Sequence, residues 1–297
     1  MKKTSRLLGE FELIARYFAP LARGFPGAFG LLDDAAVIAP PPGHELVAKT
    51  DAIVGGVHFL HDDPPDLIAR KALRVNLSDL AAKGAVPRAY MLDIMLPATV
   101  TEQWIAAFAR GLAQDQEAYG VPLIGGDTDS TPGPLAIAIM AFGDVATGQL
   151  IRRCGARAGD TVFVTGTIGD AALGLDVLRG ALPNLDANAA GILIDRYRLP
   201  RPRVTLGPRL IGLASAALAL SPGRVASVFG GGDDYEILFT APRPATDGLN
   251  ALSNTLGVPI TAIGRMEPLP AGGGAEVTVL DGSGRPLAFE RDGWTHF

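Results

Sequence analysis

Four short acidic segments hold the side chains of this 297-residue chain whose types and spacing could do chemistry. Each segment lies at the edge of an apolar stretch, where a side chain can leave the core and reach a cleft. Carboxylates that come together repel one another unless cations lie between them. Mg²⁺ prefers oxygen ligands, commonly one or two carboxylates together with water and substrate phosphates. The pattern therefore predicts a metal-assisted phosphate site. The segments are Asp33-Asp34, Thr50-Asp51, Asn76-Leu77-Ser78-Asp79 and Gly125-Gly126-Asp127-Thr128.

Taken singly, each segment also has a plainer interpretation. Asp33-Asp34 is compatible with a solvated turn that enters a strand. Asn76 and Asp79 are three apart in a predicted helix, so they share a face, and polar groups among apolar neighbours need partners. In the Gly-Gly-Asp-Thr segment, two glycines would let backbone amides approach a phosphate closely. That tetrapeptide is also compatible with an ordinary turn between two strands.

The chain lacks the sequence motifs of several other catalytic and nucleotide-binding sites. There is no Gly-x-x-x-x-Gly-Lys-Ser/Thr loop, no Gly-x-Gly-x-x-Gly after a strand and no Gly-x-Ser-x-Gly elbow. One cysteine, Cys154, and four scattered histidines do not make a zinc set. In the second half, Arg153 is either a surface cation or a phosphate contact, and three glycines before Asp233 favour a loop that closely follows a ligand.

Composition narrows the class of protein. The chain is 48% hydrophobic and 19% charged, which allows a sizeable core, and its net charge of −5 argues against a nucleic-acid binder with a basic surface. A single cysteine excludes an internal disulfide and fits a reducing compartment. No secretory signal core and no uninterrupted apolar stretch of about 18 residues is present, so no membrane span is expected. These features predict a cytoplasmic enzyme.

The predicted elements mix helices and strands in both halves of the chain. This mixture indicates an α/β or α+β class with two lobes, a first domain at 1–147 and a second at 148–297. Helices are expected at 10–22, 66–83, 101–119, after the Gly166 to Gly169 turn through Leu178, and at 188–198, 204–220 and 246–256. Strands are expected at 35–39, 46–48, 89–96, 121–124, 135–142, 161–165, 236–240, 260–264 and 276–280.

Taken in order, these segments resemble the thiamine-monophosphate kinase family, of the superfamily that includes aminoimidazole ribonucleotide synthetase. The resemblance runs over nearly the whole chain. It is carried by residues 10–18, Asp33 to Ala36, Thr50-Asp51, Gly56 to Phe59, residues 71–82, Leu123 to Thr128, Gly159-Asp160, Val164 to Thr167, Gly230 to Glu236 and Trp294.

The resemblance implies a fold and an activity. The fold would have two lobes, with an N-terminal lobe that pairs with a second copy to form a shared β-barrel, and a C-terminal α/β lobe. The activity would be transfer of the γ-phosphoryl group of ATP onto thiamine monophosphate, giving thiamine diphosphate and ADP, with Mg²⁺ and positioning in place of a covalent enzyme intermediate. By analogy, Asp34, Thr50, Asp51, Asp79 and Asp127 would hold Mg²⁺, Gly126, Asp127 and Arg153 would contact ATP, and His58, Asp233 and Trp294 would contact thiamine monophosphate.

Two departures from the family pattern stand beside this resemblance. Leu32 occupies the place of a glycine that precedes the paired aspartates. An Asp-x-Ser-Asp-Gly-Leu motif, expected after the helix predicted at 204–217, is absent, so the second domain is shortened near 217–230. The missing motif keeps open a non-catalytic or impaired homologue that binds nucleotide or thiamine phosphate. A third possibility is a related ATP-dependent enzyme that acts on another acceptor.

Overall fold

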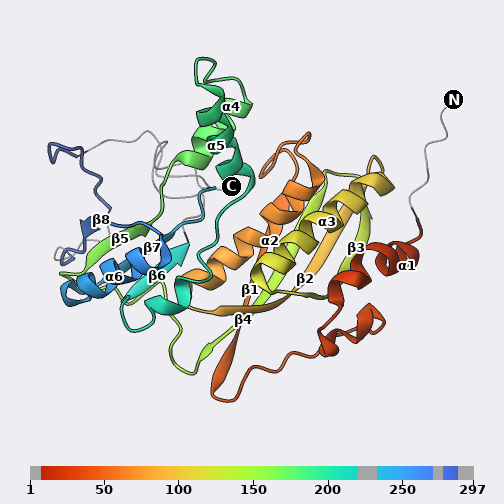
Figure 1. Cartoon of the computed structure of the whole chain (residues 1–297), viewed down its shortest axis with the longest axis horizontal. Coiled ribbons are helices and arrows are strands. Elements are labelled where there is room, and N and C mark those ends of the chain that lie inside the picture. Colours follow the sequence, from red (N-terminus) through yellow and green to blue (C-terminus); the bar gives the residue numbers. More distant parts are fainter. Residues whose placement is uncertain (1–7, 220–232, 270–276, 287–297) are drawn as a thin grey trace. The chain divides into compact units, whose positions relative to one another are not determined.

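The computed structural model describes residues 8–219, 233–269 and 277–286. The chain forms two compact units, each with its own four-stranded sheet (Figure 1). The first unit comprises Met1–Leu150 and Arg198–Ile211, and the second comprises Ile151–Tyr197 and Gly212–Phe297. The chain therefore leaves the first unit near residue 150, returns to it for one short segment and leaves again. Within the described residues, no helix is both long enough and apolar enough to cross a membrane.

The sheet of the first unit has the order β1-β4-β2-β3. β4 pairs antiparallel with both β1 and β2, whereas β2 and β3 are parallel. Among the described residues β1 and β3 are edge strands, so this sheet is open and does not close into a barrel. The strands are β1 (His44–Val54), β2 (Val86–Pro97), β3 (Leu123–Thr131) and β4 (Ala136–Ala146).

Two long helices cover one face of this sheet, and both confirm the sequence prediction (Figure 1). α2 (Pro65–Ala82) begins with proline, whose fixed φ suits a first helical position. α3 (Glu102–Tyr119) begins after Thr101, whose hydroxyl accepts a hydrogen bond from the amide of Trp104 at 3.2 Å. It ends at Gly120, which takes the left-handed conformation typical of a helix C-cap.

The N-terminal segment packs on part of the opposite face. The helix predicted at 10–22 is helical throughout, but as a series of short pieces: α1 (Glu10–Leu13), a π-helix (Ile14–Phe18) and a 3₁₀ helix (Ala19–Ala22). A second 3₁₀ segment, Pro26–Leu31, follows. The apolar residues of this segment form one cluster with the sheet, and its members are Ala22, Phe25, Ala28, Leu31, Ala36, Ile38, Ala89, Met91, Ile124 and Phe142.

The strand predicted at 35–39 is wrong. The amide of Val37 donates to the carbonyl of Gly27 at 2.9 Å, so this stretch bonds back to the 3₁₀ segment and joins neither edge of the sheet. Its apolar residues are explained by packing onto the sheet face.

The second unit contains a smaller sheet of order β6-β7-β5-β8, in which all neighbours are antiparallel. The rings of Phe163 and Phe239 stack at a centroid distance of 5.4 Å and join its two central strands. The elements are β5 (Thr161–Thr165), α4 (Asp170–Leu178), α5 (Ala187–Arg198), β6 (Ala216–Ala219), β7 (Ile237–Ala241), a 3₁₀ turn (Arg243–Ala245), α6 (Thr246–Leu256) and β8 (Ile260–Arg265). The strand predicted at 276–280 is wrong, because among its described residues only Leu280 forms a bridge, an isolated one to Pro286.

The helix predicted at 204–220 is also wrong. Only a 3₁₀ turn, Gly207–Leu210, forms at its start, and the alanine-rich end becomes strand β6. Pro208 and the left-handed Gly212 interrupt a helix there. Pairing of Ala217 with Phe239 then decides the outcome, because sheet packing overrides the helix propensity of alanine.

Candidate active site

Two of the predicted metal-binding carboxylates meet at a single lysine. The Nζ atom of Lys49 lies 3.0 Å from Oδ1 of Asp51 and 2.6 Å from Oδ2 of Asp79. Lys49 and Asp51 are two apart on β1, so both side chains point to the face that the helices cover, while Asp79 reaches them from α2. β1 and α2 therefore hold two carboxylates around one point of positive charge.

The lysine is electrostatically coupled to both carboxylates. Burial works to lower the pKa of Lys49, but the hydrogen bonds and charges of Asp79 and Asp51 outweigh it. The pKa is therefore raised from its ordinary value near 10.5. The ammonium group stays charged at neutral pH and offsets part of the negative charge of the pair.

These carboxylates have the donor chemistry that Mg²⁺ requires. They are oxygen ligands, they already converge on a cation, and both remain in contact with solvent, with side-chain exposures of 39% for Asp51 and 13% for Asp79. In the part of the chain that the structure describes, no three His, Cys, Asp or Glu side chains are grouped closely enough to hold an ion. Two carboxylates with water and substrate phosphates are, however, an ordinary Mg²⁺ environment.

Thr50 lies on the other face of β1. It pairs with the exposed Met140, whereas Asp51 pairs with the fully buried Ile139. Because side chains alternate along a strand, the hydroxyl of Thr50 points away from Asp51. The structure therefore separates these two adjacent predicted ligands.

Asp127 lies at the far edge of the same sheet. It is on β3 and pairs with Asp93 of β2, while Asp51 is on β1, the opposite edge. Three strand spacings separate those edges, which corresponds to about 14 Å. Within one described chain, Asp51 and Asp127 therefore do not share an ion.

The Gly-Gly-Asp-Thr segment lies inside β3, so the predicted turn is wrong. Gly126 has a φ of +145°, and a Cβ there would lie 1.9 Å from the carbonyl oxygen of Leu92. A Cβ on Gly125 would meet only the flexible end of Met91, at 2.8 Å. The second glycine is thus required by close approach of β2, whatever else its amide does.

Asp34 follows a turn with unusual backbone geometry. Phe29, Gly30 and Leu31 all have positive φ, at +50°, +69° and +58°. Leu32, in the place of the family's glycine, has an ordinary φ of −106°, so leucine is not strained there. Asp34 itself is exposed, and no hydrogen bond or ion pair among the described residues joins it to Asp51 or Asp79.

His58 is fixed within the turn that follows β1. Its Nδ1 accepts a hydrogen bond from the amide of Val54 at 3.0 Å, which places the ring proton of the neutral form on Nε2. The ammonium of the buried Lys71 donates to the carbonyl of His58 at 2.9 Å. The first hydrogen bond orients the ring, and the second holds the backbone of this turn.

The remaining predicted site residues belong to the second unit. Arg153 is exposed, Asp233 is half-buried, and Trp294 lies outside the described residues. Asp233 lies two residues before a strained residue, because Tyr235 is buried with a φ of +52°. Such a conformation is rare for a bulky side chain and marks a backbone that its surroundings hold in place.

Two acidic residues on either side of Tyr235 were not predicted from the sequence. Asp234 accepts hydrogen bonds from the amides of Gly169, at 2.6 Å, and Ala171, at 2.9 Å, at the start of α4. Burial raises the pKa of Asp234 above its ordinary value near 3.8, and these amides offset only part of the rise. The N-terminus of α4 is thereby closed by the chain itself.

Glu236 is the second of these residues, and it is 1% exposed. The hydroxyl of Thr165 donates to its Oε2 at 2.6 Å, and Arg196 lies 3.9 Å from its Oε1. The same hydroxyl accepts from the amide of Ile237. The glycines before Asp233 marked this segment as a candidate ligand loop, but no local pattern in it distinguishes a buried structural acid from a ligand.

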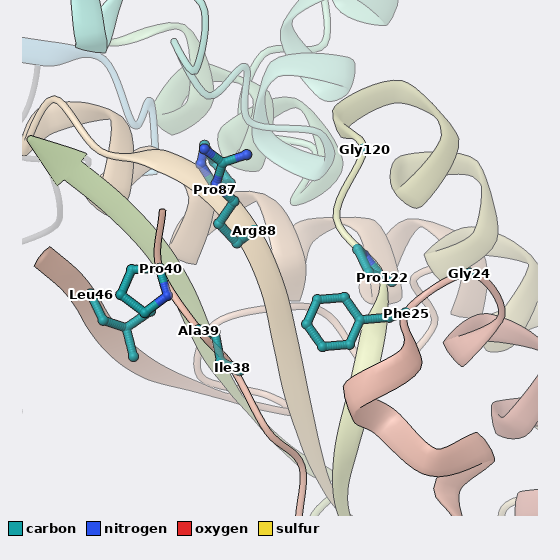
Figure 2. Close-up of a pocket in the computed structure, with 10 residues that line it drawn as sticks. All are labelled: Gly24, Phe25, Ile38, Ala39, Pro40, Leu46, Pro87, Arg88, Gly120 and Pro122. Carbon is teal, nitrogen blue, oxygen red and sulfur yellow. The ribbon is translucent and has the colours of Figure 1, made fainter. Parts of the chain in front are cut away.

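The described residues also surround a cavity of about 340 Å³ in the first unit, and Figure 2 shows its lining. Phe25, Pro122 and Ile38 supply apolar wall, and Arg88 enters from the start of β2. Arg88 is bound to the buried Asp144, so its charge is already balanced. None of the predicted site residues lines this cavity.

Comparison with known proteins decides the family. Residues 32–145 match the family model described as AIR synthase related protein, N-terminal domain. The thiamine-monophosphate kinase of Caulobacter vibrioides is 38% identical, over 97% of this chain and 90% of the relative. The chain belongs to the thiamine-monophosphate kinase family.

Solved structures of the family share its mixed α/β fold. Thiamine-monophosphate kinase from Stenotrophomonas maltophilia superposes with a TM-score of 0.75 at 35% identity, covering 88% of this chain and 94% of that one. The structure described as AaThiL complexed with AMPPCP and TMP gives a TM-score of 0.72 at 26% identity, covering 91% and 97%. The resemblance inferred from the sequence is confirmed.

The alignment also bears on the missing motif. It runs over 328 positions with the Caulobacter vibrioides kinase, more than the 297 residues of this chain, so that kinase contains residues without a counterpart here. A shortened segment relative to the family is consistent with the absent Asp-x-Ser-Asp-Gly motif.

Proposed function

We propose that this chain is a Mg²⁺-dependent thiamine-monophosphate kinase, which transfers the γ-phosphoryl group of ATP to the phosphate of thiamine monophosphate. The observation that carries the proposal is the convergence of Asp51 and Asp79 on one cation, in a chain that matches kinases of this name over 97% of its length. Its single, exposed cysteine agrees with a cytoplasmic location.

The chemistry follows from the charges of the reactants. Donor and acceptor are both phosphate anions, so neutralising their repulsion and aligning them in line supplies most of the catalysis, without a protein nucleophile. Mg²⁺ would supply that neutralisation when bound. In this proposal the metal ligands are Asp34, Thr50, Asp51, Asp79 and Asp127, the ATP contacts are Gly126, Asp127 and Arg153, and the thiamine monophosphate contacts are His58, Asp233 and Trp294.

The proposal includes a homodimer, and the strand order supports it. Asp51 and Asp127 occupy opposite edges of one sheet, so one copy does not bring them together. Both edges are long, at 11 residues for β1 and 9 for β3, and unpaired edges of this length favour strand addition. Pairing β1 of one copy with β3 of the other would close a shared barrel and place the strand that carries Asp127 of the partner subunit beside the strand that carries Asp51.

The test of the activity is a coupled assay. Purified protein is given ATP and thiamine monophosphate, with Mg²⁺ or with EDTA, and both ADP and thiamine diphosphate are quantified. We expect equal amounts of the two products with Mg²⁺ and none with EDTA. A folded dimer, verified by light scattering, that makes no thiamine diphosphate at millimolar Mg²⁺ would reject the proposal.

A second candidate is a homologue that binds nucleotide or thiamine phosphate without turnover. The absent Asp-x-Ser-Asp-Gly motif favours it, because that segment has no replacement in the sequence. Calorimetry separates the two: binding of thiamine monophosphate and an ATP analogue, together with no product in the coupled assay, supports the non-catalytic homologue.

A further inference from the structure

Lys49 is positioned to compete with a metal ion. Its ammonium group is the only cation that an ion pair joins to either Asp51 or Asp79 in the described part of the chain, and it touches both. The two contacts use one oxygen of each carboxylate, Oδ1 of Asp51 and Oδ2 of Asp79. A divalent cation that bridges these carboxylates must therefore enter the space that the ammonium occupies.

The pair also depends on the lysine when no metal is present. β1 and α2 hold the two carboxylates within reach of one nitrogen, and without a cation they would repel each other at this separation. Partial burial strengthens that repulsion, since Asp79 is only 13% exposed. Removing the lysine charge thus leaves an unneutralised acidic pair.

The lysine can leave without disrupting the core. Its side chain is 27% exposed, and its long stem carries rotatable bonds that let the ammonium swing to solvent or to an incoming phosphate. Ala141, its partner on β4, is fully buried, and among the described residues the ion pairs of Lys49 are with Asp51 and Asp79 and not with core residues.

We propose that Lys49 is a built-in counter-ion that holds Asp51 and Asp79 together in the metal-free protein and is displaced when a divalent cation binds. The inference rests on the proposed function for the identity of the metal ligands. The lysine weakens binding of the bare cation and favours a cation that arrives with phosphates, because the phosphates accept the displaced ammonium.

The experiment measures metal binding and stability without turnover. Mn²⁺ is titrated into the substrate-free, full-length protein by calorimetry and by electron paramagnetic resonance, for the wild type, Lys49→Met and Lys49→Arg. We expect Lys49→Met to bind Mn²⁺ about tenfold more tightly, the effect of removing a competing charge at this distance. Its melting temperature in EDTA falls below the wild-type value, and Mn²⁺ raises it by more than it raises that of the wild type.

Two variants keep the test decisive. Lys49→Arg retains the positive charge and should fold and bind Mn²⁺ within about threefold of the wild type. Arg110→Met, an exposed position on α3, removes the same charge elsewhere and should leave Mn²⁺ affinity unchanged. If Lys49→Met binds Mn²⁺ equally or more weakly, or if Arg110→Met matches its gain, the inference is wrong.

The readout separates this inference from the proposed function. If Lys49 competes with Mn²⁺ but the protein has no kinase activity, the inference holds and the proposed function is rejected. If the protein is an active kinase but substitution of Lys49 does not change its Mn²⁺ affinity, the proposed function holds and the inference is rejected.

Discussion

The acidic residues of the two units have different kinds of partner. In the first unit, Asp51 and Asp79 keep solvent contact and share the ammonium group of one lysine. In the second unit, Asp234 is bound by two backbone amides and Glu236 by a hydroxyl, with both side chains turned into the protein. A ligand would have to displace one side chain in the first case, but several fixed hydrogen bonds in the second.

The difference distinguishes carboxylates that can bind a ligand from carboxylates that hold the fold. Amide and hydroxyl partners are fixed parts of the folded chain, so loss of such a hydrogen bond lowers the free energy of unfolding. A lysine at the end of a flexible stem can be exchanged for another cation at small cost. Substitutions in the two units should therefore affect different measurements.

The largest expected effect is on catalysis in the first unit. Asp79→Asn should lower kcat/KM for thiamine monophosphate by about 10³-fold, because an amide does not neutralise a cation between two phosphates. The melting temperature should change little, since the amide keeps the shape of the carboxylate. Steady-state assays and thermal unfolding are the measurements, and wild-type kcat/KM in a folded variant would contradict the metal role of Asp79.

The next effect is on stability in the second unit. Glu236→Ala should lower the free energy of unfolding by about 2–3 kcal/mol, because the hydroxyl of Thr165 and the nearby Arg196 lose a buried partner. Urea unfolding followed by circular dichroism measures this. If the free energy of unfolding of this variant lies within about 0.5 kcal/mol of the wild-type value, the acidic residues of the second unit do not hold the fold, and the two units do not differ in this respect.

The smallest effect is a pH dependence at Asp234. Its pKa is raised in the folded protein, so the contribution of this group to stability is fully present below its ordinary pKa near 3.8 and is lost as pH rises through the folded value. Asp234→Asn removes the charge and leaves one acceptor oxygen for two amides that bind separate oxygens of the carboxylate, so its stability is lower at low pH but does not depend on ionisation of this group. Relative to the wild type, this variant should gain stability between pH 3.5 and pH 7, by less than the Glu236 effect. Parallel unfolding curves at all pH values would show that the group does not titrate in this range.

Much of the fold followed from local pattern, because long periodic segments carry their own signal. α6 (Thr246–Leu256) was predicted to the residue, and α2 and α3 to within a few residues, from apolar spacing and caps. The prediction failed at residues 204–220 and 35–39. In both places contacts with distant residues decided the structure, and a window of neighbours does not contain them.

The candidate site was also predicted only in part. Residue types identified Asp51 and Asp79, and the period of two along β1 would have pointed to Lys49 beside Asp51. The separation of Asp51 from Asp127 depends on strand order, which no local pattern encodes. The buried roles of Asp234 and Glu236 depend on α4 and β5, about 65 to 70 residues earlier in the chain.

The strand order also affects the folding of the first unit during its synthesis. β4 is the only sheet neighbour of β1 among the described residues, and about 80 residues separate the end of β1 from the start of β4. At ribosomal rates of about 5–20 residues per second, β1 waits roughly 4–16 s for its partner. During that interval the nascent strand exposes the apolar residues 46–48 and 52–54, and the charges of Lys49 and Asp51 between them act as gatekeepers against premature association between chains.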